Sequence, residues 1–288
     1  ARLDWKRSFG DHNLTAMAMY MMREYRSDVL PNRNQGYSGR VTYDYASKYL
    51  VEFNFGYNGS ERLAAGQRFE FFPAVSAGWV ASSEKFWEPI SKYINHFKIR
   101  GSYGLVGSDA FASGAPHFLY QNNISIGSAH KFWTGLPTSE ISKQGPGFYV
   151  LAVQDAGWEH VKKFDIGFDM MLFDQLNITF DYFHDKRERI LMSRASWPSM
   201  LGYWGSKPWS NIGEVENQGF ELSLNWTKQF GKDLTLDLRG NFTYNQNEYK
   251  YVDEPNYPYV WQTNTGKPLN TVKGYIAEGL FTSEEEIA

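Results

Sequence analysis

The sequence predicts an all-β protein, a transmembrane antiparallel β-barrel of which about ten strands are present. Long segments alternate apolar and polar side chains: Tyr49, Val51 and Phe53 fall on one face of a strand, and Glu52 and Asn54 fall on the other. The connections between these segments are alternately very short and long. Aromatic residues are also abundant, with 10 Trp, 19 Tyr and 21 Phe in 288 residues. A barrel wall accounts for all three observations, because lipid and lumen take its opposite faces.

The first part of the chain predicts six strands. A tight turn at 10–13 joins strands 2–9 and 14–25, and a polar stretch, 26–38, follows. The second hairpin pairs 40–45 with 49–60 across three residues, and loop 61–71 leads to a strand at 72–81. Between 82 and 96 the apolar residues recur at spacings of three and four, which indicates a short amphipathic turn before the strand at 97–106.

The second part predicts a long loop and four more strands. Segment 107–157 is rich in Gly, Ser, Pro and Asn and is expected to be a loop without regular structure, of a length that soluble domains rarely contain but barrels carry on their outer side. Strands 158–173 and 177–192 then pair, loop 193–210 follows, and strands 211–227 and 234–248 form the most regular hairpin. After Tyr249 the sequence predicts loop again.

Composition excludes several classes of function. The formal net charge is −3, the pI is about 6.1, and no basic stripe is present, so nucleic acid is not expected as a partner. The absence of cysteine excludes disulfides and thiolate sites. The sequence has no run of about eighteen apolar residues, so it predicts no membrane-spanning helix. The mean hydropathy of −0.51 is compatible with a barrel, because every second strand residue faces water.

Candidate chemistry is sparse, and no enzyme activity, catalytic residue, metal site or cofactor is predicted. The six histidines have no metal-ligand spacing with acidic helpers. Carboxylate pairs such as Asp165 with Asp169, or Asp237 with Glu221, could serve a glycosidase. Their place on the alternating polar face favours lining of the lumen instead. The predicted lumen-facing residues are Glu52, Asn54, Lys98, Arg100, Asp165, Asp169, Asp237 and Arg239.

Aromatic residues of the long loops are the candidate substrate contacts. Trp and Tyr rings present flat apolar faces to sugar rings and a polar edge to hydroxyl groups. The alternative is that these rings pack the loops against each other, a plug or a partner protein. The candidates are Trp133, Trp197, Tyr203, Trp204 and Trp209.

Five ordered motifs resemble the SusC/RagA family of TonB-dependent outer-membrane transporters. They are GYSGRVTYDYASKYLVEFNFGYNGSERL at 36–63, FFPAVSAGWV at 71–80, KIRGSYGLVGSD at 98–109, WEHVKKFDIGFD at 158–169 and NIGEVENQGFEL at 211–222. The resemblance extends from near Ala1 to the GYIAEGLFTSEEEI stretch at 274–287.

The resemblance implies a barrel of about 22 strands with a plug inside it, in the bacterial outer membrane. It implies TonB-dependent import of oligosaccharides or peptides, with a SusD-like surface lipoprotein as a lid and TonB acting through the plug. Residues 1–288 are expected to form a partial barrel domain without the plug and the closing strands, so the working protein is expected to be longer. Outer-membrane lipid would cover the apolar strand face.

Two other interpretations remain open. A soluble carbohydrate-binding β-sandwich or adhesin would also have alternating strands, but sandwich strands are usually five or six residues long. Segments 177–192 and 234–248 are about fifteen residues long, as barrel strands often are. A passive porin or another small closed barrel would have neither plug nor lid.

Overall fold

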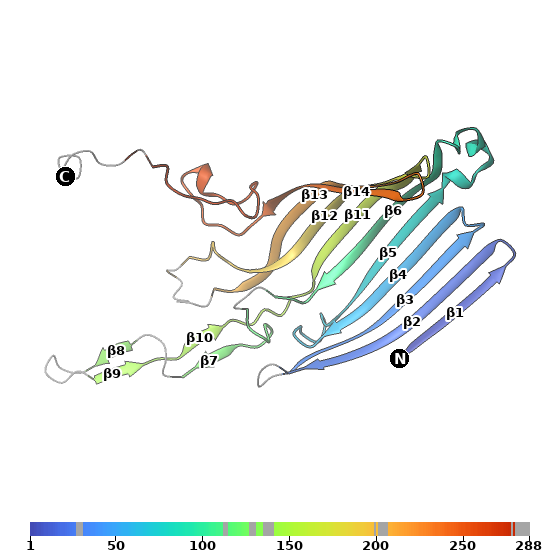
Figure 1. Cartoon of the computed structure of the whole chain (residues 1–288). Helices are drawn as coiled ribbons and strands as arrows, with labels where there is room; N and C mark the ends of the chain where they lie inside the picture. Colours follow the sequence, from blue (N-terminus) through green and yellow to red (C-terminus); the bar gives the residue numbers. More distant parts are fainter. Residues whose placement is uncertain are drawn as a thin grey trace.

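The computed structural model describes residues 1–26, 31–111, 115–126, 131–134, 141–198, 200, 207–277 and 279. Its main feature is one curved sheet of ten strands, in which every neighbouring pair is antiparallel. Figure 1 shows the sheet with β1 at one edge and β14 at the other. The strands are β1 (Arg2–Phe9), β2 (His12–Tyr25), β3 (Asn32–Tyr45), β4 (Tyr49–Ser60), β5 (Phe69–Val80), β6 (Ile94–Ser108), β11 (Glu159–Leu172), β12 (Leu176–Ser193), β13 (Trp209–Phe230) and β14 (Leu234–Tyr251).

All the short connections lie at one end of the sheet. Two of the turns have pairs of residues with left-handed φ angles, Ala46 with Ser47 and Phe173 with Asp174. Such turns match the right-handed twist of the paired strands. The predicted helical turn between β5 and β6 is present as two 3-10 helices, η1 (Ala81–Ser83) and η2 (Lys85–Ile90). Another 3-10 helix of the described residues, η4 (Val260–Gln262), follows β14.

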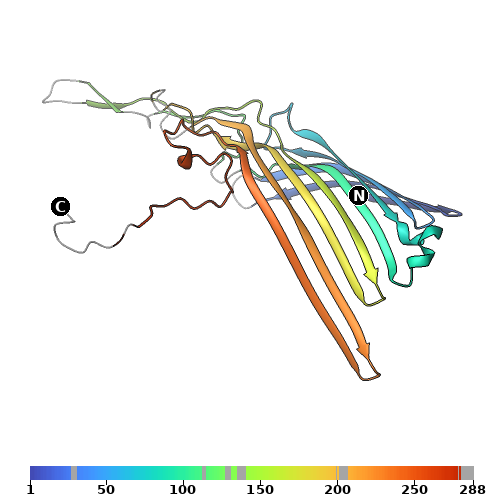
Figure 2. The same cartoon turned by 90° about the horizontal axis from the view of Figure 1, so that it is seen from above.

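The long connections gather at the opposite end, called the loop end below. The connection from β6 to β11 contains four short strands, β7 (Asn123–Ser125), β8 (Lys131–Thr134), β9 (Ile141–Gln144) and β10 (Gly147–Val150). β7 pairs with β10 and β8 with β9, so the prediction of an irregular loop over 107–157 was wrong for these parts. In both Figure 1 and Figure 2 this segment extends beyond the sheet as an arm.

The two faces of the sheet differ in chemistry. Register places Phe53 opposite Val75 and Phe220 opposite Tyr244, whereas Glu52 lies opposite Ser76 on the other face. Five rings form a continuous row across five strands, with neighbouring centroids 5.6 to 6.1 Å apart: Phe97, Phe168, Phe180, Phe220 and Phe242. We call the face that carries these rings the aromatic face, and the face that carries Glu52 the charged face.

The aromatic face has no second layer of protein over it in the described part of the chain. Phe53 is 42% exposed and Leu236 is 39% exposed. A β-sandwich buries the apolar face of each sheet against a second sheet. The single sheet with exposed rings therefore contradicts the sandwich alternative. None of the described helices is long and apolar enough to span a membrane.

The two clusters of buried apolar side chains are small and lie at the loop end. Leu63, Phe72 and Trp158 form one cluster, and Leu119, Ala156 and Leu191 form a second. The first cluster contains Trp158, where the β6–β11 connection ends. The second contains Leu119 and Ala156 of the connection itself. The fold therefore buries apolar side chains where a long segment must be attached to the sheet.

Candidate functional site

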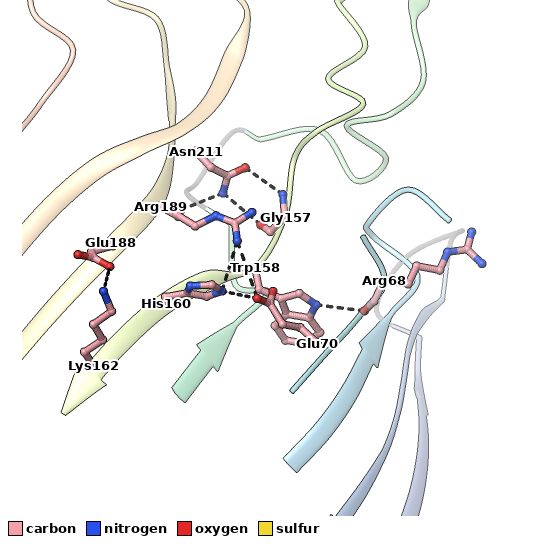
Figure 3. Close-up of polar contacts among 9 residues, drawn as sticks. All are labelled: Arg68, Glu70, Gly157, Trp158, His160, Lys162, Glu188, Arg189 and Asn211. Atoms are coloured by element: carbon pink, nitrogen blue, oxygen red, sulfur yellow. Dashed lines mark hydrogen bonds and ion pairs between the residues drawn. The ribbon is translucent and has the colours of Figure 1, made fainter. Parts of the chain in front are cut away.

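A β-bulge at the loop end forms the centre of the site (Figure 3). The register between β12 and β13 shifts between Arg187 and Ile190, and Arg189 takes a φ of 58°. A bulge of this kind changes the direction of a side chain and ends regular pairing. Here it directs the backbone carbonyl of Arg189 toward Asn211, whose Nδ2 donates a hydrogen bond to it at 2.8 Å.

The side chain of Asn211 attaches the end of the β6–β11 connection to this bulge. Its Oδ1 accepts a hydrogen bond from the buried backbone N–H of Gly157 at 3.0 Å, and its Nδ2 donates to the Gly157 carbonyl at 3.1 Å. A Cβ at position 157 would lie 2.4 Å from a guanidinium nitrogen of Arg189. Glycine at 157 therefore leaves room for the Arg189 guanidinium beside this part of the backbone.

A second set of contacts joins β5 to β11. The pairing of β5 with β6 runs only from Ala74 to Val80, so the loop-end part of β5 has no ladder to β6. There His160 Nε2 lies 2.7 Å from Glu70 Oε1, and the Arg189 guanidinium lies 3.4 Å from the same His160 nitrogen. Side-chain contacts replace backbone pairing at this point.

Trp158 completes the attachment from the apolar side. It is 4% exposed, and its ring meets Phe72 edge-on with centroids 5.4 Å apart. Its Nε1 donates a hydrogen bond to the Arg68 carbonyl at 3.0 Å. A buried tryptophan with its N–H satisfied is a strong packing anchor. Trp158 therefore holds the start of β11 against the β4–β5 loop.

The second core cluster holds the remainder of the connection. Val153 N–H donates to the Leu119 carbonyl at 2.7 Å, so the two ends of the arm lie side by side. Leu191 N–H donates to the buried Glu159 carboxylate at 3.3 Å. The ring of Trp209 packs against this cluster.

A carboxylate after β14 attaches the β12–β13 loop. Asp253 is 5% exposed and accepts hydrogen bonds from Ser196 N–H at 2.9 Å and Ser196 Oγ at 2.8 Å. Arg194 Nε lies 3.3 Å from the same carboxylate. Burial raises the pKa of Asp253, but the Ser196 hydrogen bonds and the charge of Arg194 together outweigh burial, so the pKa lies below its usual value.

The charged face carries an ion-pair network around Arg100. Its guanidinium lies 2.7 Å from Asp181, 3.3 Å from Asp169 and 3.5 Å from Asp165. Gly167 lies beside this network, and a Cβ there would come within 2.2 Å of an Asp181 oxygen. The close approach of Asp181 therefore requires glycine at that position.

The eight predicted lumen residues all lie on the charged face by register. Glu52 pairs with Arg40 and accepts a hydrogen bond from Asn54, and Asp237 accepts one from Thr227. Glu52, Lys98, Arg100 and Asp165 also line one groove of about 420 Å³. Sequence reasoning missed Asp181, although its alternation with Thr179 within β12 was a usable indication.

The aromatic candidates are separated in the structure. Trp133 lies on β8 in the arm and is 61% exposed. Trp197 is half-buried in the β12–β13 loop, and Trp209 is half-buried against the second core cluster. Tyr203 and Trp204 lie outside the described residues. Of the candidates that the structure describes, Trp133 alone presents most of its side chain to solvent, and Trp209 packs as the alternative interpretation predicted.

Asn211, Arg189 and Glu70 were not identified as site residues from the sequence. Their contacts join segments that are distant in the chain, and no local spacing indicates them. Asn211 does begin the NIGEVENQGFEL motif, which was the available indication. In the described ranges, no group of three or more acidic or histidine side chains is placed to hold a metal ion.

A family model described as "TonB dependent receptor-like, beta-barrel" matches residues 1–282. The chain belongs to the TonB-dependent receptor β-barrel family. This membership confirms the predicted family resemblance and the predicted barrel fold. It also favours a TonB-dependent receptor over the passive-porin alternative.

The relatives of this TonB-dependent receptor barrel are named as TonB-dependent receptors, and one of them is SusC. The chain is 31% identical over 211 residues to TonB-dependent receptor P3 of Formosa agariphila, covering 73% of this chain and 20% of that protein. It is 25% identical over 228 residues to TonB-dependent receptor SusC of Bacteroides thetaiotaomicron, covering 79% of this chain and 22% of SusC. By their names these relatives are receptors, not enzymes.

Solved structures show the same fold. The RagAB peptide importer in its open-open state matches with a TM-score of 0.71 and 18% identity over 87% of this chain and 29% of that chain. The siderophore receptor PirA from Pseudomonas aeruginosa matches with a TM-score of 0.52 and 13% identity, over 86% of this chain and 43% of that chain. This TonB-dependent receptor barrel thus spans about a fifth to a quarter of the length of the curated relatives it matches.

Proposed function

We propose that residues 1–288 form part of the wall of an outer-membrane importer that takes up oligosaccharides or peptides. A SusD-like surface lipoprotein would cover its mouth, and TonB would act through a plug domain. SusC among the relatives and the RagAB peptide importer among the structural neighbours support this choice of cargo and partner. The observation that carries the proposal is the contrast between the aromatic face and the charged face of one sheet.

Dimensions support a lipid-facing role for the aromatic face. On β13 the side chains from Phe220 to Phe230 on this face span ten residue steps, about 33 Å of strand at roughly 3.3 Å per residue. A strand tilt of about 40° projects this length onto about 25 Å, the height of the apolar band of an outer-membrane barrel. Lys228 interrupts the row near the turn, where its Nζ lies over the Phe230 ring, as a snorkelling side chain does.

Charged pairs take over from the rings toward the loop end of the same face. Lys162 Nζ lies 2.6 Å from Glu188, as Figure 3 shows, and Lys186 lies 2.7 Å from the same carboxylate. Lys250 and Glu216 continue the pairs at 2.7 Å on β14 and β13. We assign this change from rings to ion pairs to the boundary between hydrocarbon and headgroups, because charged side chains are destabilising at the bilayer midplane.

The charged face would then line the lumen, as predicted for its eight residues, and would face a plug or water. Arg100 and its three aspartates would act as a fixed polar surface of the wall. The arm would stand at the outer mouth, where Trp133 is available to cargo or to the lipoprotein. No covalent chemistry is assigned to any of these groups.

The arm gives the sharpest test. Asn122 Oδ1 accepts a hydrogen bond from Ala152 N–H at 2.8 Å, so the ends of the arm already lie together. Excision of 123–150 from the full-length protein, with Asn122 joined to Leu151, leaves both core clusters in place. We expect normal insertion into the outer membrane and loss of lipoprotein capture or of cargo uptake.

Control variants separate the causes. Trp133→Ala should lower uptake without preventing capture of the lipoprotein if this ring contacts cargo. Insertion is measured by surface labelling, capture by co-purification of a SusD-like lipoprotein, and uptake with labelled oligosaccharides and labelled peptides. Normal capture and normal uptake by the arm-less protein would contradict the proposed role of the arm. Extraction of the full-length protein into buffer without detergent would contradict the membrane assignment itself.

A further inference from the structure

A second polar pocket lies on the charged face at the loop end, separate from the Arg100 network. It has a volume of about 230 Å³ and lies between the ends of β2 and β3 and the start of the β6–β11 connection. Arg23 and Asn34 are register partners on the charged face. The pocket is lined by Arg23, Tyr25, Asn32, Arg33, Asn34, Arg62, Asp109 and Ala110.

The lining contains more positive charge than its own carboxylate can neutralise. Arg33 Nε is engaged by Glu24 at 3.0 Å. Asp109, the one carboxylate among the described lining residues, accepts a hydrogen bond from the Asn34 amide at 2.7 Å. In the part of the chain that the structure describes, neither Arg23 nor Arg62 forms an ion pair within 4 Å.

The environment of Arg62 distinguishes this pocket from an ordinary exposed arginine. Its guanidinium lies 4.2 Å over the ring of Phe111 and donates to the Asp109 carbonyl at 3.1 Å. Its Nε is out of contact with solvent and has no hydrogen-bond partner among the described residues. Burial lowers the pKa of Arg62, although the charge of Asp109 opposes this. A partly desolvated guanidinium of this kind gains from an anionic partner more than a fully hydrated one does.

We propose that this pocket binds a carboxylate group of the cargo between Arg23 and Arg62. The inference rests on the proposed import function and narrows its cargo to acidic molecules. The guanidinium groups match the geometry of a carboxylate and can donate paired hydrogen bonds to it. The hydroxyl of Tyr25 and the amides of Asn32 and Asn34 supply further donors. The carboxylate can come from an acidic sugar or from the C-terminus of a peptide.

The experiment measures binding to the purified full-length receptor with two matched pairs of probes. One pair is tetragalacturonate and its methyl ester, and the other is tetraalanine with a free C-terminus and its amide. We expect one acidic probe to bind about 10-fold or more tightly than its neutral counterpart, since a charge-assisted hydrogen bond contributes this much. The pair that shows the difference identifies the source of the carboxylate.

Arg23→Gln tests the assignment, because Arg23 is exposed on a strand and its replacement leaves the core intact. Arg7→Gln is the control, an exposed arginine on the aromatic face at the short-turn end of the same hairpin. The preference for the acidic probe should fall to within about twofold in Arg23→Gln and persist in Arg7→Gln. Equal binding of both members of each pair by the parent receptor would overturn the inference, as would an unchanged preference in Arg23→Gln or failure of all four probes to bind.

Uptake assays separate this inference from the proposed function. Cells with the Arg23→Gln receptor should still import any neutral probe that the parent receptor imports. If the parent imports neutral probes and shows no acidic preference, only the carboxylate site is wrong. If the parent imports no probe and captures no lipoprotein, the proposed function is wrong as well.

Discussion

Replacing Asn211 with alanine should release the β6–β11 connection from the sheet while leaving the sheet folded. The Asn211 side chain makes three hydrogen bonds, at 3.0 and 3.1 Å to Gly157 and at 2.8 Å to the Arg189 carbonyl. Alanine removes all three and leaves the buried Gly157 N–H without its partner. The strands on either side keep their backbone ladders, so the effect should be local.

The size of the effect follows from these contacts. Each hydrogen bond contributes about 1 kcal/mol net, and water can reach part of the site because Asn211 is only partly buried. We therefore expect the free energy of local opening to fall by about 2 kcal/mol. Since about 1.4 kcal/mol is a factor of ten, protection of the amides at 153–158 should fall about 30-fold.

Hydrogen exchange followed by mass spectrometry on the full-length receptor in detergent measures this change. Asn241→Ala is the matched control, because Asn241 is an exposed asparagine on the charged face of β14, where it pairs in register with Ser223. Its substitution should leave exchange at 153–158 unchanged. If Asn211→Ala also left this exchange within about twofold of the parent, the bulge contacts would not be what holds the connection.

Two further predictions concern charged groups. Arg100→Met leaves three carboxylates facing one another. Because the arginine is 32% exposed, solvent screens part of this repulsion, and the free energy of unfolding should fall by about 1–2 kcal/mol. The urea midpoint should fall, and adding Asp181→Asn should restore part of it; a rise in midpoint would count against the network as a stabilising feature. The lowered pKa of Asp253 contributes stability above its unfolded pKa of about 3.9, and this contribution disappears as pH falls through the folded value. The melting temperature of the parent should therefore exceed that of Asp253→Asn at pH 7, and the two temperatures should converge below about pH 4. A difference in melting temperature that does not change with pH would refute the role of the Asp253 charge.

The alternation of side chains was enough to predict the strands wherever one face is aromatic and the other is polar. The predicted strand 49–60 has the bounds of β4, and every predicted pairing is present. β3 extends from Asn32, whereas the prediction began at Arg40, because the segment 32–35 is polar on both faces.

The site was predictable only in part. Alternation within each strand was enough to place Glu52, Arg100 and Asp237 on one face. Every second residue of a strand lies on the same face, and a regular register keeps these faces aligned from one strand to the next. The bulge at Arg189 breaks that register, so no period in the sequence indicates it. Its contact with Asn211 and Gly157 depends on three segments meeting in space.

The loop-end anchors lie on a sheet that no second layer covers in the described ranges of the chain. A long connection on a globular protein can pack onto a core, but a barrel wall has lipid on one side and water or plug on the other. The sheet must therefore make its own attachment points, and the divergence of β5 from β6 provides one. Phe72 and Glu70 on β5 there meet Trp158 and His160 at the start of β11 through a ring contact and a polar side-chain contact. The divergence of β5 from β6 thus gives this sheet a fixed base for the arm, which is the part proposed above to meet cargo or the lipoprotein.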